Sequence, residues 1–251
     1  MTAAMAALHA GSIKEPYANK GGYMFRYVLV FSKRGPIKYT SHLDMQRLFK
    51  RAFRRGEIDL AYSKGFNPHP KMGFAQPLSL GYEGDGEWMD FETDSAVTAD
   101  SIFRDVASYL PAGISILKFG TPKKKESPAA ALTAAEYKVY LPVGFEECGI
   151  HELLSSYMRQ DTITTLKRSK KSKELKPVEI KDKIRSITGF GLEDKTSILK
   201  LLLDCGSKSN LSAESVISNF IEFSKLRCER YEIEVCRSKL IFPLDYTVDW
   251  V

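Results

Sequence analysis

Apolar residues in the first half of the chain recur at two spacings. After Ser41 they lie three or four positions apart and so share one face of a helix: Met45, Leu48, Phe49, Ala52 and Phe53. Other runs are short and rich in aromatic and β-branched residues, as strands are. The predicted order is a strand over residues 25–31, a helix from residue 41, strands over 60–62 and 88–91, a helix over 102–110 and a strand over 114–119.

The second half repeats this order of elements without repeating the residues. Alternation predicts strands over residues 137–143 and 231–235, apolar runs predict strands over 162–166 and 198–203, and helical spacing appears over 150–157 and again after Ser212. Two consecutive βαββαβ sets predict an α+β fold made of two tandem ferredoxin-like halves. A single larger sheet formed from the same elements is the alternative.

The composition between the two halves predicts a linker. Residues 121–130 read Thr-Pro-Lys-Lys-Lys-Glu-Ser-Pro-Ala-Ala, which is typical of a connecting segment. Residues 1–22 show neither helical nor strand periodicity. The predicted organisation is therefore a flexible N-terminal tail (1–22), a first ferredoxin-like domain (23–120), a linker (121–133) and a second ferredoxin-like domain (134–251).

Composition narrows the classes of function. The 251 residues are 43% hydrophobic and carry a formal net charge of +6, which predicts a normal core and an anionic partner. No apolar run is long enough to span a membrane, and the N-terminus lacks the basic region of a signal peptide, so a cytoplasmic protein is expected. The four cysteines show no metal-ligand spacing, and neither a phosphate-binding Gly-Lys loop nor a serine-hydrolase motif occurs. No cofactor is expected in this chain.

The start of the first predicted helix, Ser41-His42-Leu43-Asp44, has a structural and a chemical interpretation. Ser41 at the N-cap with an acidic residue three positions later is a capping-box arrangement. His42 is not needed for capping, and the positive end of the helix disfavours its protonation. A neutral imidazole at this position can act as a base. A solvated histidine without a function explains His42 equally well.

A long loop, Ser63-Lys64-Gly65-Phe66-Asn67-Pro68-His69-Pro70-Lys71, follows the helix and the short second strand. Each proline restricts the residue before it to an extended backbone, so His69 is held in a stiff segment. Because a stiff segment loses little entropy when it binds, a contact between His69 and a ligand is favoured over a purely structural role. The aromatic residues expected to stack on unpaired bases are Tyr62, Phe66 and Phe74.

A metal shared by His42, Asp44 and His69 is disfavoured. The first two residues are two positions apart on a helix, and their side chains therefore diverge. No metal site is expected.

Basic residues suggest contacts with phosphate. Arg47, Arg51 and Arg54 are spaced to form one stripe on the first helix, at a small cost in helix stability because like charges repel at this spacing. Guanidinium groups bind phosphate through two hydrogen bonds, so the stripe indicates an anionic ligand. A second basic segment is either a solvated loop or an arm that follows a nucleic-acid backbone. Its residues are Lys167, Arg168, Lys170, Lys171 and Lys173, and Lys64 and Lys71 of the loop complete the expected phosphate-binding set.

The Ser41–Asp44 motif, the arginine-rich helix and the loop from Ser63 to Lys71 together resemble the bacterial radical-SAM-linked proteins. That family is a domain of unknown function, found fused to or encoded beside a radical S-adenosylmethionine protein. The likeness is dense over residues 26–90 and continues more diffusely to residue 237. It implies a radical S-adenosylmethionine enzyme as a partner, and it names no reaction for this chain.

Three hypotheses follow from these residues. In the first, the chain is an accessory protein that binds RNA through phosphate and base contacts and presents it to the partner enzyme. In the second, it is a metal-independent RNA-processing or RNA-modifying enzyme with His42 and His69 as general base and acid. In the third, it is a scaffold that binds only its partner enzyme. The predicted topology can bring His42 and His69 into one cleft, beside Arg47 or Lys71.

Overall fold

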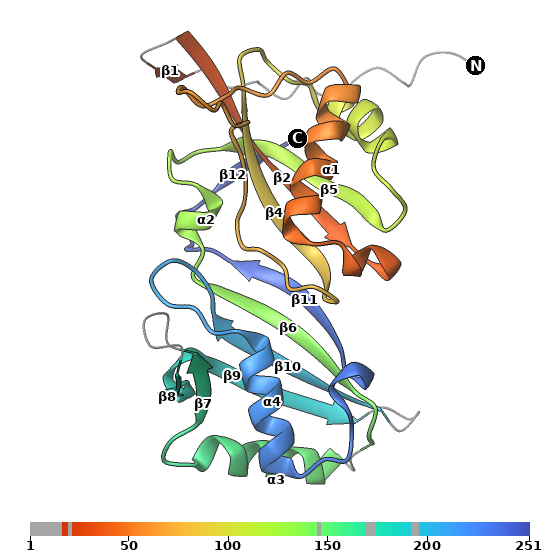
Figure 1. The fold of residues 1–251 in the computed structure, drawn as a ribbon, viewed down its shortest axis with the longest axis vertical. Helices are drawn as coiled ribbons and strands as arrows, with labels where there is room; N and C mark the ends of the chain where they lie inside the picture. The colour runs from red at the N-terminus through yellow and green to blue at the C-terminus, as the bar shows by residue number, and fades with distance from the viewer. Residues whose placement is uncertain (1–16, 20–21, 145–146, 169–173, 192–195) are drawn as a thin grey trace, which may run out of the picture.

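The computed structural model describes residues 17–19, 22–144, 147–168, 174–191 and 196–251. They have a mixed α/β fold with one large, mostly antiparallel sheet and few helices (Figure 1). The helices are α1 (His42–Arg55), α2 (Pro128–Ala131), α3 (Glu147–Arg159) and α4 (Ala213–Ser224), with a π-helical turn at Ser101–Val106 and short 3-10 turns at Gly35–Tyr39, Lys181–Lys183 and Arg230–Glu232. None of the described helices is long and apolar enough to cross a membrane.

Among the described residues, ten strands form the large sheet and two more form a separate hairpin. The ten are β1 (Tyr17–Asn19), β2 (Gly22–Lys33), β3 (Met72–Phe74), β4 (Glu83–Thr93), β5 (Ile114–Pro122), β6 (Ala134–Leu141), β9 (Ile184–Gly191), β10 (Ser197–Asp204), β11 (Glu234–Ile241) and β12 (Val248–Trp250). The hairpin consists of β7 (Thr164–Arg168) and β8 (Leu175–Glu179).

The strand order in the sheet is β12-β5-β2-β4-β11-β6-β10-β9, with β1 beside β2 and β3 beside β4. All of these neighbours are antiparallel except β4 and β11, which pair in parallel and join the first half of the chain to the second. The order within the two halves is β5-β2-β4-β3 and β11-β6-β10-β9. The structure thus contains a single large sheet, which was the alternative interpretation of the sequence.

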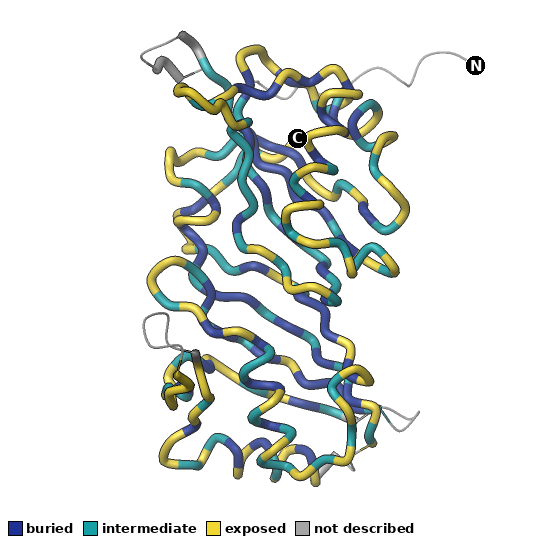
Figure 2. Tube along the Cα trace, in the orientation of Figure 1, coloured by how far each residue is buried: buried dark blue, intermediate teal, exposed yellow. Residues whose placement is uncertain are grey.

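Two hydrophobic cores lie between the helices and one face of this sheet. Helix α1 buries Met45, Phe49, Ala52 and Phe53 in the first core, which confirms the helical spacing of these residues. The second core lies beneath α3 and α4, which Figure 1 draws on the same face of the sheet as α1. In Figure 2 the buried positions follow the central strands of both halves.

Most predicted elements are present, but five predictions need correction. The strand predicted over 162–166 overlaps β7 of the separate hairpin, so β9 is the second strand of the second half. The strand predicted over 231–235 begins with the 3-10 turn at Arg230–Glu232, and β11 starts only at Glu234. Residues 60–62 make only single bridges, Leu60 with Thr93 and Tyr62 with Pro70, so β3 is the second strand of the first half. Strand β1 lies within residues 1–22, where no strand is predicted, because three residues are too few to show alternation. The predicted linker, residues 121–133, contains the end of β5 and helix α2.

A buried ion pair joins the two cores beside the parallel contact of β4 and β11. The Arg237 guanidinium donates from Nε to Glu87 Oε1 at 2.9 Å and from Nη2 to the other oxygen of the same carboxylate. It also donates to the carbonyl oxygen of Gln76 at 2.7 Å. Gly84 leaves the space for this pair, because a Cβ there would lie 2.7 Å from Glu87 Cγ.

Removal of one partner should destabilise the fold strongly. Arg237→Met leaves the Glu87 carboxylate buried without a partner, and the free energy of unfolding should fall by about 3–5 kcal/mol. The double variant Glu87→Gln/Arg237→Met should lose less than Arg237→Met alone, because the carboxylate and its guanidinium partner are removed together. Urea titration followed by circular dichroism measures both values. Arg104→Met removes an exposed ion pair with Asp105 and is the control, with an expected loss of at most about 1 kcal/mol.

Candidate functional site

Ser41 caps the N-terminus of α1 as the sequence predicts, but Asp44 bonds the Ser41 hydroxyl and not the Ser41 backbone N–H that a capping box uses. Ser41 Oγ accepts a hydrogen bond from the backbone N–H of Asp44 at 3.2 Å and donates one to Asp44 Oδ2 at 2.7 Å. Arg47 Nη1 donates to the other carboxylate oxygen at 2.9 Å. These hydrogen bonds, from Ser41 first and from Arg47 second, lower the pKa of Asp44. The Asp44 side chain therefore bonds the Ser41 hydroxyl and Arg47, which fixes the first turn of the helix.

The loop from Ser63 to Lys71 is held in shape by its own backbone. The Ser63 N–H donates to the carbonyl oxygen of His69 at 2.8 Å, and the His69 N–H donates to Ser63 Oγ at 3.0 Å. The Lys71 N–H donates to the carbonyl oxygen of Ala61 at 2.7 Å. Phe66 at the tip of the loop is fully exposed. These bonds bring the two ends of the loop together, so His69 lies on a closed and stiff segment.

Helix α1 and this loop form an open groove of about 410 Å³, here called the His69 groove. Its lining residues are Leu43, Gln46, Arg47, Lys50, His69, Pro70 and Met72. The four helical residues share one face because they lie three or four positions apart. The volume is in the range of small-molecule sites, which are commonly 300–1,000 Å³ in proteins.

The groove has two exposed cations, and an aromatic ring lies beside one of them. The Arg47 side chain is 69% exposed, and among the residues that the structure describes its carboxylate partner is Asp44, which is also exposed. Lys50 Nζ lies 5.6 Å from the centroid of the Tyr62 ring, and Tyr62 is itself 46% exposed. The structure thus brings together Arg47, His69 and Tyr62 of the predicted set, and it adds Lys50 to them.

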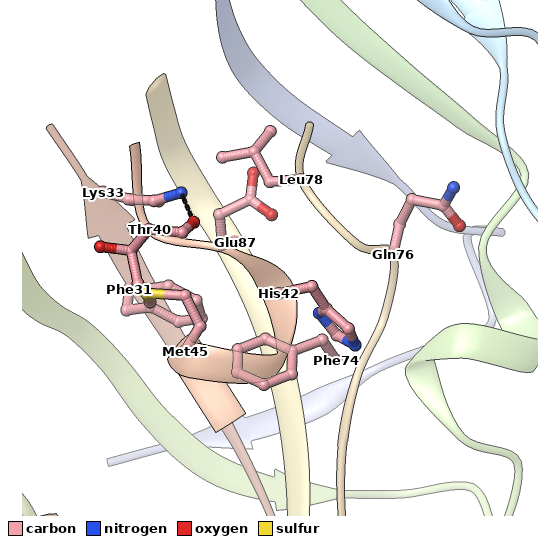
Figure 3. A pocket seen from close by; sticks show the side chains of 9 residues that line it. All are labelled: Phe31, Lys33, Thr40, His42, Met45, Phe74, Gln76, Leu78 and Glu87. Carbon is pink, nitrogen blue, oxygen red and sulfur yellow. Dashed lines mark hydrogen bonds between the residues drawn. The ribbon is translucent and has the colours of Figure 1, made fainter. Parts of the chain in front are cut away.

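A second and much narrower pocket, here called the His42 pocket, lies beside the helix N-terminus (Figure 3). It is lined by Phe31, Lys33, Thr40, His42, Met45, Phe74, Gln76, Leu78 and Glu87. Its cavity volume of about 20 Å³ has room for a single water molecule. This pocket is therefore too small for a nucleotide.

Lys33 is buried beside this pocket and supports the segment that precedes α1. Its ammonium group donates to the carbonyl oxygens of Lys38 at 3.0 Å and Thr40 at 2.9 Å. Burial lowers the pKa of Lys33, and the nearby Glu87 opposes this shift. Figure 3 shows the amine directed toward Thr40 with the Glu87 carboxylate next to it. Lys33 thus fixes the backbone just before Ser41.

The two predicted catalytic histidines line different pockets. The His42 ring packs edge-on against Phe74 at 5.4 Å between centroids, and its Nε2 lies 3.3 Å from Gln46 Nε2. His69 instead lines the open groove, which Gln46 also lines. The prediction of one shared cleft is wrong, because position 42 turns toward the sheet while positions 43, 46 and 47 turn toward the loop.

Three other predicted contacts also need correction. Phe74 packs inside the first core against Phe31 and Phe49, so its ring is not free to stack on a base. Lys71 turns away from the groove and pairs with Glu92 at 2.7 Å. Arg51 does not continue the stripe of Arg47, because it lines a separate groove of about 350 Å³ with Arg55 and Tyr109 on the other flank of α1.

The remaining basic residues are divided between two places. Arg54 is exposed near the end of α1, and Lys64 is exposed at the tip of the loop. Lys167 and Arg168 end strand β7, whereas Lys170, Lys171 and Lys173 lie outside the described residues. Figure 1 draws the β7–β8 hairpin at the opposite end of the molecule from α1. The basic hairpin therefore does not extend the His69 groove.

Sequence reasoning missed two residues that the structure brings into the site. Lys50 lies one turn after Gln46 and Arg47, and a helical projection centred on those two residues would have selected it in place of Arg51. Lys33 follows Tyr27, Leu29 and Phe31 at alternate positions, which places it on the core face of β2. Within the described ranges, no three His, Cys, Asp or Glu side chains are grouped as metal ligands.

Comparison with known proteins gives a family but no activity. Residues 26–213, three quarters of the chain, match the model of a family described as uncharacterized protein conserved in bacteria (DUF2344). No curated protein matches the chain. A chain in the crystal structure of a Cbf5-Nop10-Gar1 complex is similar, with 12% identity and a TM-score of 0.42, over 85% of this chain and 48% of that one. The chain thus spans about half the length of that solved chain, and so low a TM-score supports no inference.

The partly buried position of His42 should make stability depend on pH. Burial lowers the pKa of His42 below its ordinary value of 6.5, so the unfolded chain takes up a proton more readily than the folded one. The stability that neutral His42 contributes is present above the unfolded pKa and is lost as the pH falls through the folded pKa. The urea midpoint of wild type should therefore fall more between about pH 7.5 and about pH 5.5 than that of His42→Gln. Equal losses in both proteins would show that His42 titrates as a solvated residue.

Proposed function

We propose that this chain, which belongs to the DUF2344 family of uncharacterized proteins conserved in bacteria, binds single-stranded RNA through the His69 groove and presents it to a partner enzyme. We propose a radical S-adenosylmethionine enzyme as the partner, because the motifs at Ser41–Asp44 and Ser63–Lys71 resemble those of the radical-SAM-linked proteins. The proposal places the protein in the cytoplasm.

One observation carries the proposal. The His69 groove places two exposed cations, Arg47 and Lys50, opposite an imidazole on a closed and stiff loop. Arginine and lysine side chains bind phosphate oxygens, and a fixed His69 loses little entropy when it contacts a ligand. The groove is open and of ligand size, so a phosphate with its sugar can enter it.

The surroundings of the groove favour a polynucleotide over a small phosphorylated metabolite. Tyr62 at the groove and Phe66 at the tip of the loop expose aromatic rings, and exposed rings stack on unpaired bases. Arg51 and Arg55 line the second groove on the other flank of α1, where the Arg55 guanidinium lies 5.9 Å from the centroid of Tyr109. Cations and aromatic rings lie on both flanks of α1, so they can contact several phosphates of a polynucleotide, whereas a small metabolite would occupy only one flank.

The arrangement of the two histidines favours binding over catalysis. A general base and a general acid must both reach the reacting phosphate, and His42 faces Phe74 in a pocket with room for one water molecule.

We also propose that the two halves are ferredoxin-like units. The order β5-β2-β4-β3 and the order β11-β6-β10-β9 support this, since each half places its fourth, first, third and second strands side by side.

Binding of RNA should depend on salt and on the groove. A fluorescein-labelled oligouridine titrated with wild-type protein should show a log affinity that falls linearly with log salt concentration. Arg47→Gln/Lys50→Gln should weaken binding and reduce the magnitude of that slope by about 1.4, or about 0.7 for each lost phosphate contact on a single strand. Fluorescence anisotropy at several KCl concentrations measures both quantities.

A matched control distinguishes the groove from general positive charge. Arg104→Gln/Lys208→Gln removes the same charge at exposed positions outside both grooves of α1. It should leave the affinity and the slope close to the wild-type values. The proposal is wrong if oligouridine does not bind at low salt, or if the control variant weakens binding as much as Arg47→Gln/Lys50→Gln does.

A further inference from the structure

The face of the sheet opposite the helices differs between the two halves of the chain. In the first half, the C-terminal segment covers it, with Trp88 centred 4.3 Å from Phe242 and 5.3 Å from Trp250. Lys118 Nζ lies 5.5 Å from the centroid of Trp250 on the same face. The corresponding face of the second half, here called the open sheet face, is formed by the outward residues of β6, β9 and β10.

The register of these three strands places two aromatic rings in one row. Tyr140 of β6 lies opposite Ile198 of β10, and Ile198 lies opposite Phe190 of β9. All three point away from the second core, because their neighbours Val139, Leu141 and Leu199 are buried in it. Since neighbouring strands are about 4.8 Å apart, the backbones of Tyr140 and Phe190 are about 10 Å apart, with Ile198 between them. Both rings are half-buried, and Ile198 between them is buried.

The next row on the same face is basic. Lys200 of β10 lies directly opposite Lys138 of β6, with Thr188 of β9 on its other side. Like charges directly opposite each other destabilise a sheet, so this pair indicates that an anion belongs between them. Lys200 Nζ also lies 5.5 Å from the centroid of Phe190. In the part of the chain that the structure describes, neither lysine forms an ion pair with a carboxylate.

The acidic side chains of the open sheet face already have partners. Glu136 of β6 accepts a hydrogen bond from Ser238 Oγ at 2.5 Å, and Asp204 of β10 pairs with Arg185 at 2.7 Å. On the neighbouring strand β11, Glu234 pairs with Lys38 at 3.0 Å. The face therefore offers two lysines and two aromatic rings to a ligand. Proteins bind single-stranded nucleic acid by stacking unpaired bases on aromatic rings and by placing cations next to the phosphates, and this face offers both.

We infer that the open sheet face, through Tyr140, Phe190, Lys138 and Lys200, is a second binding site for single-stranded RNA. This inference rests on the proposed function, and it adds a site that lies away from the His69 groove. The two rings stack on two bases, and the two lysines contact the phosphates beside them. A strand long enough to reach both sites is held at two places on the chain.

Substitutions on the open sheet face test the inference. Phe190→Leu and Tyr140→Leu keep an apolar side chain but remove the ring, and each should weaken oligouridine binding by roughly 5- to 150-fold. Lys138→Gln/Lys200→Gln should reduce the magnitude of the salt slope by about 1.4. The lysine variant relieves a like-charge contact, so it should fold at least as stably as wild type. Lys208→Gln/Arg227→Gln, at exposed positions outside the strands, is the matched control and should change neither quantity.

The outcomes separate this inference from the proposed function. If Arg47→Gln/Lys50→Gln weakens binding and the variants of the open sheet face do not, the inference is wrong and the His69 groove stands. If only the variants of the open sheet face weaken binding, the inference stands and the groove does not bind RNA. No binding of oligouridine by wild type at low salt overturns both. If light scattering shows a dimer that Phe190→Asp converts to a monomer, a second copy covers this face and the inference is wrong.

Discussion

The buried pair of Glu87 and Arg237 is the constraint on which the arrangement of the two halves depends. Their strands, β4 and β11, are paired at only two positions, so the backbone contact that joins the halves is short. A buried guanidinium and a buried carboxylate must face each other, because either alone is costly in a core. Arg237 also bonds the carbonyl oxygen of Gln76, and Gln76 lines the His42 pocket. The pair therefore ties the second half to the segment that follows β3.

Different parts of helix α1 contact the first core, the His69 groove and the His42 pocket. Its apolar side fills the first core, its Arg47 and Lys50 side forms the His69 groove, and its N-terminus holds His42 against Phe74. Lys33 fixes the backbone before the helix, and the closed loop fixes His69 across from it. Because the site is held in place from both sides, it is preorganised, and its side chains lose little conformational entropy when a ligand binds.

The two halves use the same strand order but treat the face opposite the helices differently. In the first half, Phe242 and Trp250 of the C-terminal segment pack against Trp88, whereas in the second half Tyr140 and Phe190 are only half-buried. The surfaces proposed to bind RNA are consequently of two kinds, a groove beside a helix in the first half and a sheet face in the second half. Both combine cations with aromatic rings, which is the combination that unpaired nucleotides need.

The sequence by itself determined the elements with strong periodicity and the local chemistry at their ends. The α1 core positions, the Ser41 cap and most strands follow from spacing and from hydrogen bonds within a few residues, which the order of residues fixes. Only the tertiary structure decided which side of α1 meets the loop, and so it placed Lys50 in the His69 groove, Arg51 on the other flank and His42 in a separate pocket. It also decided that Lys71 forms an ion pair with Glu92 and that Phe74 packs against the first core. These outcomes depend on packing between residues far apart in the chain, and no local pattern contains that information.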